Sequence, residues 1–389
     1  MSKRRVVVTG VGALGAPGIG VDDLWKGLQQ QPGPAPRLIE GWDPEPWIPK
    51  REARRLDKFT QFALVATEEA FAQSGEFSGV DPNRVTVSVA TGIGGLESLE
   101  TLVRTSDEEN PRVSPFMVPM MMANAAAATI SIKYGFGGQA NTPVVACAAG
   151  AQSILDGLRL IQWGYADIAV VGGAEAAARR SAREGFAAAR ALSKSGYARP
   201  FDKNRDGFVM GEGAAILVLE AEEIAKSRGV EPVAEILGAA STADAYHITA
   251  PHPEGDGAER AIRLALNDAG LTPSDIRYIN AHGTGTELND RTEGAVIHRI
   301  FGDRQPAVSS IKGTTGHCLG ASGSVEAAAV VEAIRRSELP PNIGLIEQDP
   351  EIPLTNIVTE PRGWDPGPAI SNSFGFGGHN TVVVLAPTE

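Results

Sequence analysis

Short apolar runs rich in β-branched residues alternate along the chain with longer stretches in which apolar residues recur every three or four positions. Such short runs, bounded by glycine, predict β-strands, and the periodic stretches predict helices. We expect strands at residues 5–9, 85–90, 144–146, 168–172, 214–219, 233–238, 278–281, 308–310, 369–373 and 382–385. We expect helices at residues 58–74, 124–134, 148–163, 221–228, 257–269, 290–301 and 322–336.

The alternation of strands with helices predicts an α/β fold in which most strands are parallel and helices cover both faces of the sheet. The series of elements runs twice along the chain, although the two series share no convincing residue identity. We therefore predict two structural halves, residues 1–230 and residues 231–389, joined near Gly229–Glu231.

The composition is that of an ordinary globular protein, with 389 residues of which 42% are hydrophobic and 21% are charged. The net charge of −12 argues against a general nucleic-acid binder, which usually carries a basic excess. The two cysteines, Cys147 and Cys318, make a disulfide scaffold or a cysteine-rich metal site very unfavourable. No run of 18 uncharged apolar residues and no sorting signal is recognisable, so we expect no transmembrane helix and a cytoplasmic location.

Glycine is the unusual component, at 45 of 389 residues, against a typical level of about 7%. The glycines cluster at four segments with candidate chemistry. In the first, an apolar run ends at Cys147 and a helical pattern begins at once. A helix N-terminus stabilises a thiolate through its dipole and free N–H groups. A buried structural cysteine is the competing interpretation.

The second segment, residues 280–286, places His282 after an apolar strand and follows it with two threonines that alternate with glycines. The glycines let backbone approach a ligand, and Thr284 and Thr286 are candidate hydrogen-bond donors to an extended substrate. A histidine satisfied within its own turn is the competing interpretation.

The third segment, residues 309–320, holds Lys312 and His317 between a strand end and a helix. Glu326 lies in the apolar helix that follows, where a carboxylate usually needs a cationic partner, and Lys312 is available. A solvated loop lysine is the competing interpretation. The fourth segment, residues 371–380, surrounds two phenylalanines with glycine, which suits either a gate over an apolar pocket or a tight turn with core aromatics.

One cysteine, two histidines and one lysine thus stand beside glycine turns at strand ends, where open α/β folds build their sites. A cysteine with a histidine indicates nucleophilic catalysis by a thiolate. The second histidine and the lysine are surplus to a simple cysteine hydrolase, whereas two neutral imidazoles can donate hydrogen bonds to one developing oxyanion. The set favours chemistry in which an enolate is stabilised.

Together these segments resemble the β-ketoacyl-acyl carrier protein synthases, the decarboxylating condensing enzymes of the thiolase superfamily. The resemblance covers nearly the whole chain and rests on the order Cys, His-Gly-Thr-x-Thr, Lys-x-x-x-Gly-His and Gly-Phe-Gly-Gly, with a further similar segment at residues 200–213. It implies a thiolase-like fold with two similar βαβαβαββ halves in a five-layer αβαβα sandwich. The first half would carry the nucleophile, and the second the histidines, the lysine and the gating loop.

The resemblance also implies roles. Cys147 matches the nucleophile that takes the acyl chain as a thioester, and His282 and His317 match the pair that drives malonyl decarboxylation and holds the enolate. Lys312 matches the lysine that orders the site, with Glu326 as its partner.

By the same resemblance, the backbone N–H groups of Cys147 and Phe376 match the oxyanion hole, and Phe376 with Phe374 matches the gate. Thr284 and Thr286 match residues that contact the phosphopantetheine arm. No metal or redox cofactor is implied, because the phosphopantetheine arrives on the carrier protein. The implied partners are an acyl carrier protein with its acyl or malonyl group, and a second subunit.

Acyl carrier proteins are acidic, and this chain is acidic too, so a local basic patch must dock the carrier. By resemblance, five arginines match the residues that dock the carrier: Arg51, Arg54, Arg55, Arg112 and Arg190. The competing interpretation of each is a solvated surface arginine.

Residues 31–51 form a shorter segment than in typical fatty-acid enzymes, and His379 stands where threonine is usual. The first interpretation is an elongating fatty-acid enzyme that works as a homodimer. These departures favour the alternative, which is the active ketosynthase of a type II polyketide or polyene synthase paired with a chain-length factor. A degradative thiolase needs a second catalytic cysteine, and Cys318 has the wrong context. Condensing enzymes of the Cys-His-Asn type, a Cys-His hydrolase and a non-catalytic binding protein fit the four segments less well.

Overall fold

Residues 3–106 and 113–388 are described by the structure, a computed structural model of the chain. The strands are β1 (Val6–Gly15), β2 (Gly18–Ile19), β3 (Val85–Ala90), β4 (Ala140–Asn141), β5 (Ile168–Glu175), β6 (Gly213–Ala221), β7 (Ala234–Ala243), β8 (Tyr278–Asn280), β9 (Ala307–Ser309), β10 (Glu338–Leu339), β11 (Arg362–Gly363), β12 (Ala369–Gly375) and β13 (His379–Ala386). The 3-10 helices are η1 (Pro82–Arg84), η2 (Ala146–Ala148), η3 (Pro273–Asp275) and η4 (Leu319–Ala321).

The α-helices are α1 (Val21–Leu28), α2 (Lys50–Ala53), α3 (Lys58–Ser74), α4 (Leu96–Ser106), α5 (Met117–Met121), α6 (Ala125–Tyr134), α7 (Ala149–Gln162), α8 (Arg180–Ala188), α9 (Glu222–Arg228), α10 (Asp256–Ala269), α11 (Glu287–Phe301), α12 (Lys312–Thr315) and α13 (Ser322–Arg336). Within the described ranges, none of these helices combines the length and apolar character that a membrane crossing requires. The cytoplasmic location stays a prediction.

Across the described residues, eleven strands form one sheet in the order β4-β3-β5-β6-β1-β7-β13-β12-β8-β9, with β2 paired to β1. At the centre β1 meets β7, where Val8 lies opposite Ala234. From the edge of the sheet to its centre, one series has the order β4-β3-β5-β6-β1 and the other has the order β9-β8-β12-β13-β7. When the strands of each series are numbered along the chain, with β2, β10 and β11 left out, both orders read 3-2-4-5-1. The two series thus share one topology, and the division of the chain at residue 230 stays a prediction.

The expectation that most strands are parallel is wrong. The parallel pairs, β3–β4, β3–β5, β8–β9 and β8–β12, lie toward the two edges of the sheet. The pairs from β5 through to β12 are antiparallel. One cause is local, because residues 376–378 join β12 to β13 in a turn so short that only an antiparallel pair can form.

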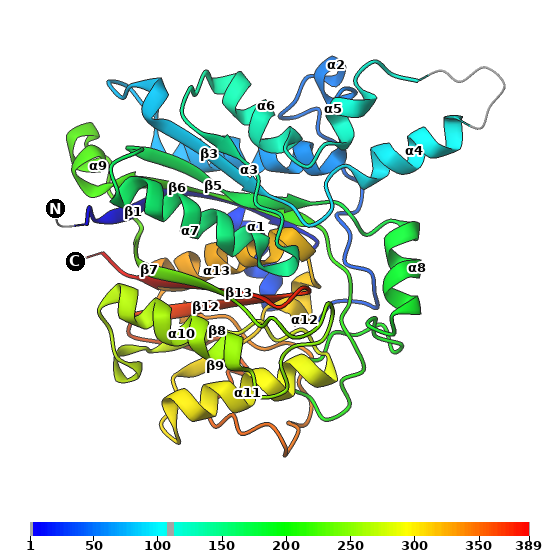
Figure 1. Ribbon diagram of the computed structural model, residues 1–389, viewed down its shortest axis with the longest axis vertical. Coiled ribbons are helices and arrows are strands. Elements are labelled where there is room, and N and C mark those ends of the chain that lie inside the picture. The colour runs from blue at the N-terminus through cyan, green and yellow to red at the C-terminus, as the bar shows by residue number, and fades with distance from the viewer. Residues whose placement is uncertain (1–2, 107–112, 389) are drawn as a thin grey trace.

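Helices and strands stack in five layers, as the family resemblance implies (Figure 1). The helix α3 packs on the outer face of β1 and β6, and α10 packs on the outer face of β7 and β13. Between the two series of strands lie α7 and α13, packed against each other. The central layer therefore contains one helix from each series.

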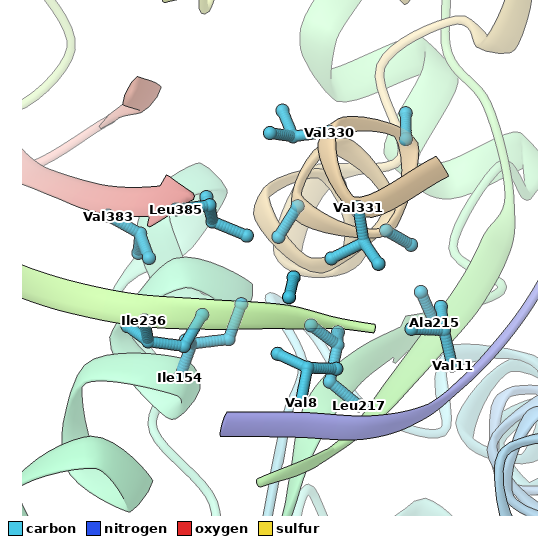
Figure 2. Packing of buried hydrophobic residues seen from close by; sticks show 14 of the residues in the cluster. Val8, Val11, Ile154, Ala215, Leu217, Ile236, Val330, Val331, Val383 and Leu385 are labelled. Atoms are coloured by element: carbon cyan, nitrogen blue, oxygen red, sulfur yellow. The ribbon is translucent and has the colours of Figure 1, made fainter. Parts of the chain in front are cut away.

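Apolar side chains form most of the core around this central layer. Figure 2 shows side chains of α7 and α13 packed between strands of both series. Ile154 of α7 and Val331 of α13 lie in one cluster with Val8, Leu217 and Val383, and all five side chains are fully buried. Burial of these chains fixes the two central helices relative to the sheet.

Local predictions from the sequence succeed where apolar periodicity is strong. The helices at 58–74 and 322–336 and the strand at 85–90 have the predicted limits. The strand predicted at 144–146 is absent, because Val144 is exposed and Ala146 adopts a φ of 50°, outside the extended region. The apolar pattern also fails to predict α1, α4 and α8.

The substitution Ile154→Ala should lower the free energy of unfolding by about 2–5 kcal/mol, because it leaves a cavity between two packed layers. Urea unfolding followed by circular dichroism measures the change. The matched control is Ile346→Ala, since Ile346 is 80% exposed and its loss should change stability by less than about 0.5 kcal/mol. Equal losses in the two variants would contradict this account of the core.

Candidate active site

Cys147 lies where the first series of elements turns into the central helix α7. The residue is in the middle of η2, and the positive φ of Ala146 turns the chain sharply just before it. Its side chain is only 8% exposed and lines a cavity of about 550 Å³. The sequence prediction that the sulfur sits at the start of a helix is correct in position.

Glycines let α7 and α13 begin side by side. A Cβ atom on Gly150 would lie 2.6 Å from the backbone nitrogen of Ser324, and one on Gly323 would lie 2.6 Å from that of Ala151. Neither position has room for a side chain. This close approach brings Cys147 next to the segment that precedes α13, which carries Lys312 and His317.

The turn between β12 and β13 closes over the sulfur. The Phe376 N–H donates a hydrogen bond to the Cys147 thiol. A Cβ on Gly375 would lie 3.0 Å from the Cys147 nitrogen, so only glycine allows this approach. Both Phe374 and Phe376 line the cavity, and the Phe376 ring lies 6.2 Å from the Phe186 ring. The structure brings the two phenylalanines to the site, and their gating role stays a prediction.

His282 and His317 face each other across the same cavity. Their ring centroids are 5.4 Å apart and the rings are nearly perpendicular. His282 directly follows Ala281 at the end of β8, and the Nδ1 of His317 lies 2.8 Å from the hydroxyl oxygen of Ser322. The two imidazoles, which are 30 or more residues apart in the chain, therefore share one site with Cys147.

Lys312 is buried behind His282. Its Nζ donates to the carbonyl oxygen of His282 at 2.6 Å and lies 3.2 Å from the Nδ1 of the same residue. It also forms an ion pair with Glu326, and both side chains are at most 2% exposed. The contact expected between Lys312 and Glu326 is thus present, and burial raises the pKa of Glu326 to about 7 while Lys312 opposes that rise.

Both imidazoles are neutral at ordinary pH. Burial lowers the pKa of His282 and of His317 well below the usual value, and the charge of Lys312 lowers both further. An ammonium group can only donate, so the His282 Nδ1 that faces Lys312 must accept. The ring proton of His282 is therefore on Nε2, where it can be donated to a ligand.

The expected stabilisation of a Cys147 thiolate is not what the structure gives. Burial raises the pKa of the Cys147 thiol to about 11, although Lys312 and the Phe376 N–H both act in the opposite direction. Loss of hydration outweighs the favourable position at the start of a helix. In the unliganded chain the nucleophile is a neutral thiol.

Thr284 and Thr286 line the same cavity, as predicted from their alternation with glycine. Their hydroxyl oxygens are 2.9 Å apart and share a hydrogen bond. Arg205 holds the segment in place, because its guanidinium donates to the carbonyl oxygen of Thr286 at 3.3 Å and forms a partly buried ion pair with Asp349. A polar strip therefore leads along one wall of the cavity.

The predicted docking arginines do not form one cluster. Arg190 is exposed and lines the cavity. Arg51, Arg54 and Arg55 are exposed in and just after α2, which Figure 1 shows beside α5 and far from α8. Arg112 lies outside the described residues.

Two site residues escaped the sequence analysis. Glu293 of α11 accepts hydrogen bonds from the backbone N–H groups of His282 and Gly283, each at 2.8 Å, and so fixes the turn that carries the imidazole. The sequence could have indicated Glu293, because it shows the same pattern that singled out Glu326, a carboxylate on a buried helix face. Ser322, the partner of His317, gave no comparable signal because serine is common at helix starts.

No group of three or more histidine, cysteine, aspartate or glutamate side chains is placed to hold a metal ion in the part of the chain that the structure describes. Cys318 is buried beside the carbonyl oxygen of Thr315, and burial raises the pKa of its thiol. His379 starts β13, with its ring against Gly377. Neither residue lines the cavity.

Alkylation of Cys147 by iodoacetamide should accelerate about tenfold per pH unit from pH 7 to pH 9, because a thiol with a pKa near 11 ionises in proportion to hydroxide over this range. Peptide mass spectrometry gives the rate. Cys318, which is 2% exposed, is the internal control and should stay unmodified in the native protein. A rate that levels off by pH 10, as a thiol with the ordinary pKa of about 8.5 would give, would show that the pKa is not raised.

Comparisons with known proteins agree with this geometry. Models of the beta-ketoacyl synthase N-terminal and C-terminal domains match residues 39–225 and 233–345. A protein from Synechocystis sp., named 3-oxoacyl-[acyl-carrier-protein] synthase 2, is 44% identical over 99% of this chain and 98% of its own length. A protein of the same name from Staphylococcus aureus strain N315 is 41% identical over 99% of both chains.

Solved structures give the same result. The ishigamide ketosynthase/chain length factor structure matches with a TM-score of 0.93 and 33% identity over 100% of both chains. A type II polyketide ketosynthase in complex with its acyl-carrier protein matches with a TM-score of 0.90 and 29% identity, again over 100% of both chains. The chain therefore belongs to the β-ketoacyl synthase family of acyl-transferring condensing enzymes.

Proposed function

We propose that the chain elongates an acyl group by two carbons, through decarboxylative condensation of an acyl thioester on Cys147 with malonyl-acyl carrier protein. The observation that carries the proposal is that one cavity holds a thiol and two neutral imidazoles, with Lys312 buried behind one of them. A cysteine hydrolase would need only one imidazole. The names of the similar proteins, 3-oxoacyl-[acyl-carrier-protein] synthase 2, support this reading.

In the first step Cys147 takes the acyl group. The sulfur attacks the thioester carbonyl of the acyl carrier, a new carbon–sulfur bond forms, and the bond to the carrier sulfur breaks. The proton of the Cys147 thiol passes to the departing carrier thiol. In this proposal the backbone N–H groups of Cys147 and Phe376 donate to the oxygen that becomes negative. The contact of the Phe376 N–H with the Cys147 thiol supports this role for Phe376.

In the second step malonyl-carrier loses carbon dioxide. The carbon–carboxylate bond breaks and its electron pair moves into the thioester, forming an enolate. His282 and His317 donate hydrogen bonds to the enolate oxygen, and Lys312 fixes the His282 ring so that the Nε2 proton faces the cavity. The imidazoles act as neutral donors because burial keeps them uncharged.

In the third step the enolate carbon attacks the thioester carbonyl on Cys147. A carbon–carbon bond forms and the carbon–sulfur bond breaks, so that the sulfur leaves as a thiolate and takes a proton from water to restore the thiol. The chain leaves on the carrier two carbons longer. The phosphopantetheine arm reaches the site as part of the substrate, along the wall that carries Thr284 and Thr286. The proposed reaction needs no further cofactor.

A second candidate is the active ketosynthase of a type II polyketide synthase working with a chain-length factor. It is supported by the high similarity to ketosynthase/chain length factor structures, one of them from Xenorhabdus doucetiae.

Either assignment includes a second subunit. We propose that the subunits meet at the β4 edge of the sheet, where the strand has one neighbour and where Ile132 and Val144 are 81% and 51% exposed.

The substitution Cys147→Ala should abolish condensation of acyl- and malonyl-carrier, because no thioester can form, while carbon dioxide release from malonyl-carrier should continue through His282 and His317. Product mass and carbon dioxide are measured in one incubation over a panel of acyl groups. Cys318→Ala is the matched control and should retain condensation. Condensation that persists in Cys147→Ala would refute the mechanism.

Charge reversal in the double variant Arg54→Glu and Arg55→Glu should raise the apparent KM for the carrier substrate severalfold, because rim charges govern association with an acidic partner. Steady-state kinetics with carrier and with free pantetheine thioesters separate docking from chemistry. An equal effect on both substrates would exclude a docking role for these two arginines.

A further inference from the structure

Glu175 is a buried carboxylate for which the proposed mechanism has no use. It is the last residue of β5, its side chain is fully buried, and none of its hydrogen bonds within the described residues comes from a cation. A buried carboxylate with no cation beside it costs folding free energy. Burial raises the pKa of Glu175 to about 7, although its hydrogen bonds oppose that rise. A carboxylate kept under these conditions indicates a role at a nearby site.

Four donors from the described part of the chain surround the Glu175 carboxylate. The N–H groups of Gly92 and Gly320 donate to its Oε2 at 2.6 and 3.1 Å. The Thr91 hydroxyl donates to its Oε1 at 3.1 Å, and the Ile93 N–H donates as well. Three of these donors belong to the segment that follows β3, and the fourth belongs to η4. One carboxylate therefore joins a segment of the first series of elements to a segment of the second.

The two segments touch each other at glycine. A Cβ atom on Gly320 would lie 2.0 Å from the backbone nitrogen of Gly92. One on Gly173, in β5, would lie 2.9 Å from the carbonyl oxygen of Gly320. Since no side chain fits between these backbones, the hydrogen bonds of Glu175 to both segments fix their relative position.

Both segments contribute apolar side chains to the cavity. Ile93 and Leu319, here called the acyl wall, line the cavity that holds Cys147, and Leu319 packs in the same apolar cluster as the sulfur. The polar strip at Thr284 and Thr286 offers no such surface. A hydrocarbon chain on Cys147 leaves water by packing against apolar side chains, so the acyl wall suits it.

The histidine that precedes η4 is held by other bonds. The Nδ1 of His317 lies 2.8 Å from the Ser322 hydroxyl oxygen. Its N–H donates to the Val209 carbonyl oxygen at 2.7 Å, and its own carbonyl oxygen accepts from the Gly211 N–H at 2.9 Å. A change at Glu175 should therefore move the acyl wall and leave the imidazole in place.

We propose that Glu175 is a positioning residue that sets the acyl wall and, through it, the discrimination of the enzyme between short and long acyl groups. The proposal rests on the proposed function and deepens it, because it assigns a determinant of acyl length. It is carried by the hydrogen bonds of one buried carboxylate to two segments that both line the cavity.

The experiment compares acetyl- and decanoyl-pantetheine as acyl donors to the enzyme. Intact-protein mass spectrometry gives the second-order rate constant of Cys147 acylation for each, and carbon dioxide release from malonyl-carrier is measured in parallel. The deciding quantity is the ratio of the decanoyl to the acetyl rate constant. Besides burial, the charge of Glu175 raises the pKa of Cys147, and its removal changes thiol reactivity. That change is common to both acyl groups and cancels in the ratio.

The variants separate the hydrogen bonds from general stability. Glu175→Gln keeps the size of the side chain but replaces an acceptor with an NH2 group that faces N–H donors. Thr91→Val removes one hydroxyl donor to Glu175, and Thr91→Ser retains it. The matched control is Glu69→Gln, because Glu69 accepts from two backbone N–H groups and lies outside the cavity lining.

The ratio should fall about tenfold in Glu175→Gln and about threefold in Thr91→Val, because the long chain loses apolar contact that the acetyl group never makes. Thr91→Ser and Glu69→Gln should keep the ratio of the unaltered enzyme. Carbon dioxide release should stay within about twofold in every variant, since His317 is held independently.

An unchanged ratio in Glu175→Gln would overturn the proposal, as would a fall that Glu69→Gln shares. If Glu175→Gln does not fold, equal ratios in Thr91→Val and Thr91→Ser would overturn it. Parallel losses of acylation and carbon dioxide release would show general damage to the site and would also overturn it. Failure of the unaltered enzyme to take an acyl group and to condense would instead refute the proposed function.

Discussion

The close crossing of α7 and α13 is the constraint on which the site depends. These helices come from different series of elements, and they meet at Gly150 and Gly323, where a single Cβ would collide with backbone. Cys147 precedes one helix and His317 precedes the other, so the crossing sets the distance between nucleophile and imidazole. A larger residue at either glycine would separate the two series and with them the two parts of the site.

Desolvation then decides the charge state of each group brought together there. Burial keeps His282 and His317 neutral and raises the pKa values of Cys147 and Glu326. Lys312 opposes the rise at both acids and reinforces the neutrality of both imidazoles. One buried cation thus influences every titrating group that the proposed reaction uses, while its ion pair with Glu326 keeps it in place.

Sequence reasoning located the chemistry better than the architecture. Short glycine-rich motifs singled out Cys147, His282, Lys312 and His317, because such motifs can be recognised in the sequence without a structure. Strand direction was mispredicted, because antiparallel pairing at the centre depends on which elements become neighbours, and periodicity reports only burial. The pKa of Cys147 was mispredicted for a similar reason, since a helix start is a local feature and the loss of hydration comes from β12, η4 and α13 together.

The hydrogen bond from Phe376 to the thiol links loading to the turn between β12 and β13. In the proposed mechanism that N–H must transfer from the sulfur to the carbonyl oxygen once an acyl group arrives. The sulfur then loses one of the two interactions that lower the pKa of its thiol. This loss has no effect on its charge, because a thioester sulfur carries no ionisable proton. The transfer requires a small movement of the turn, and Gly377 and Gly378, at φ values of 86° and 73°, hold conformations that other residues adopt only with strain. Glycine at these two positions lets the turn hold the Phe376 N–H over the sulfur without backbone strain.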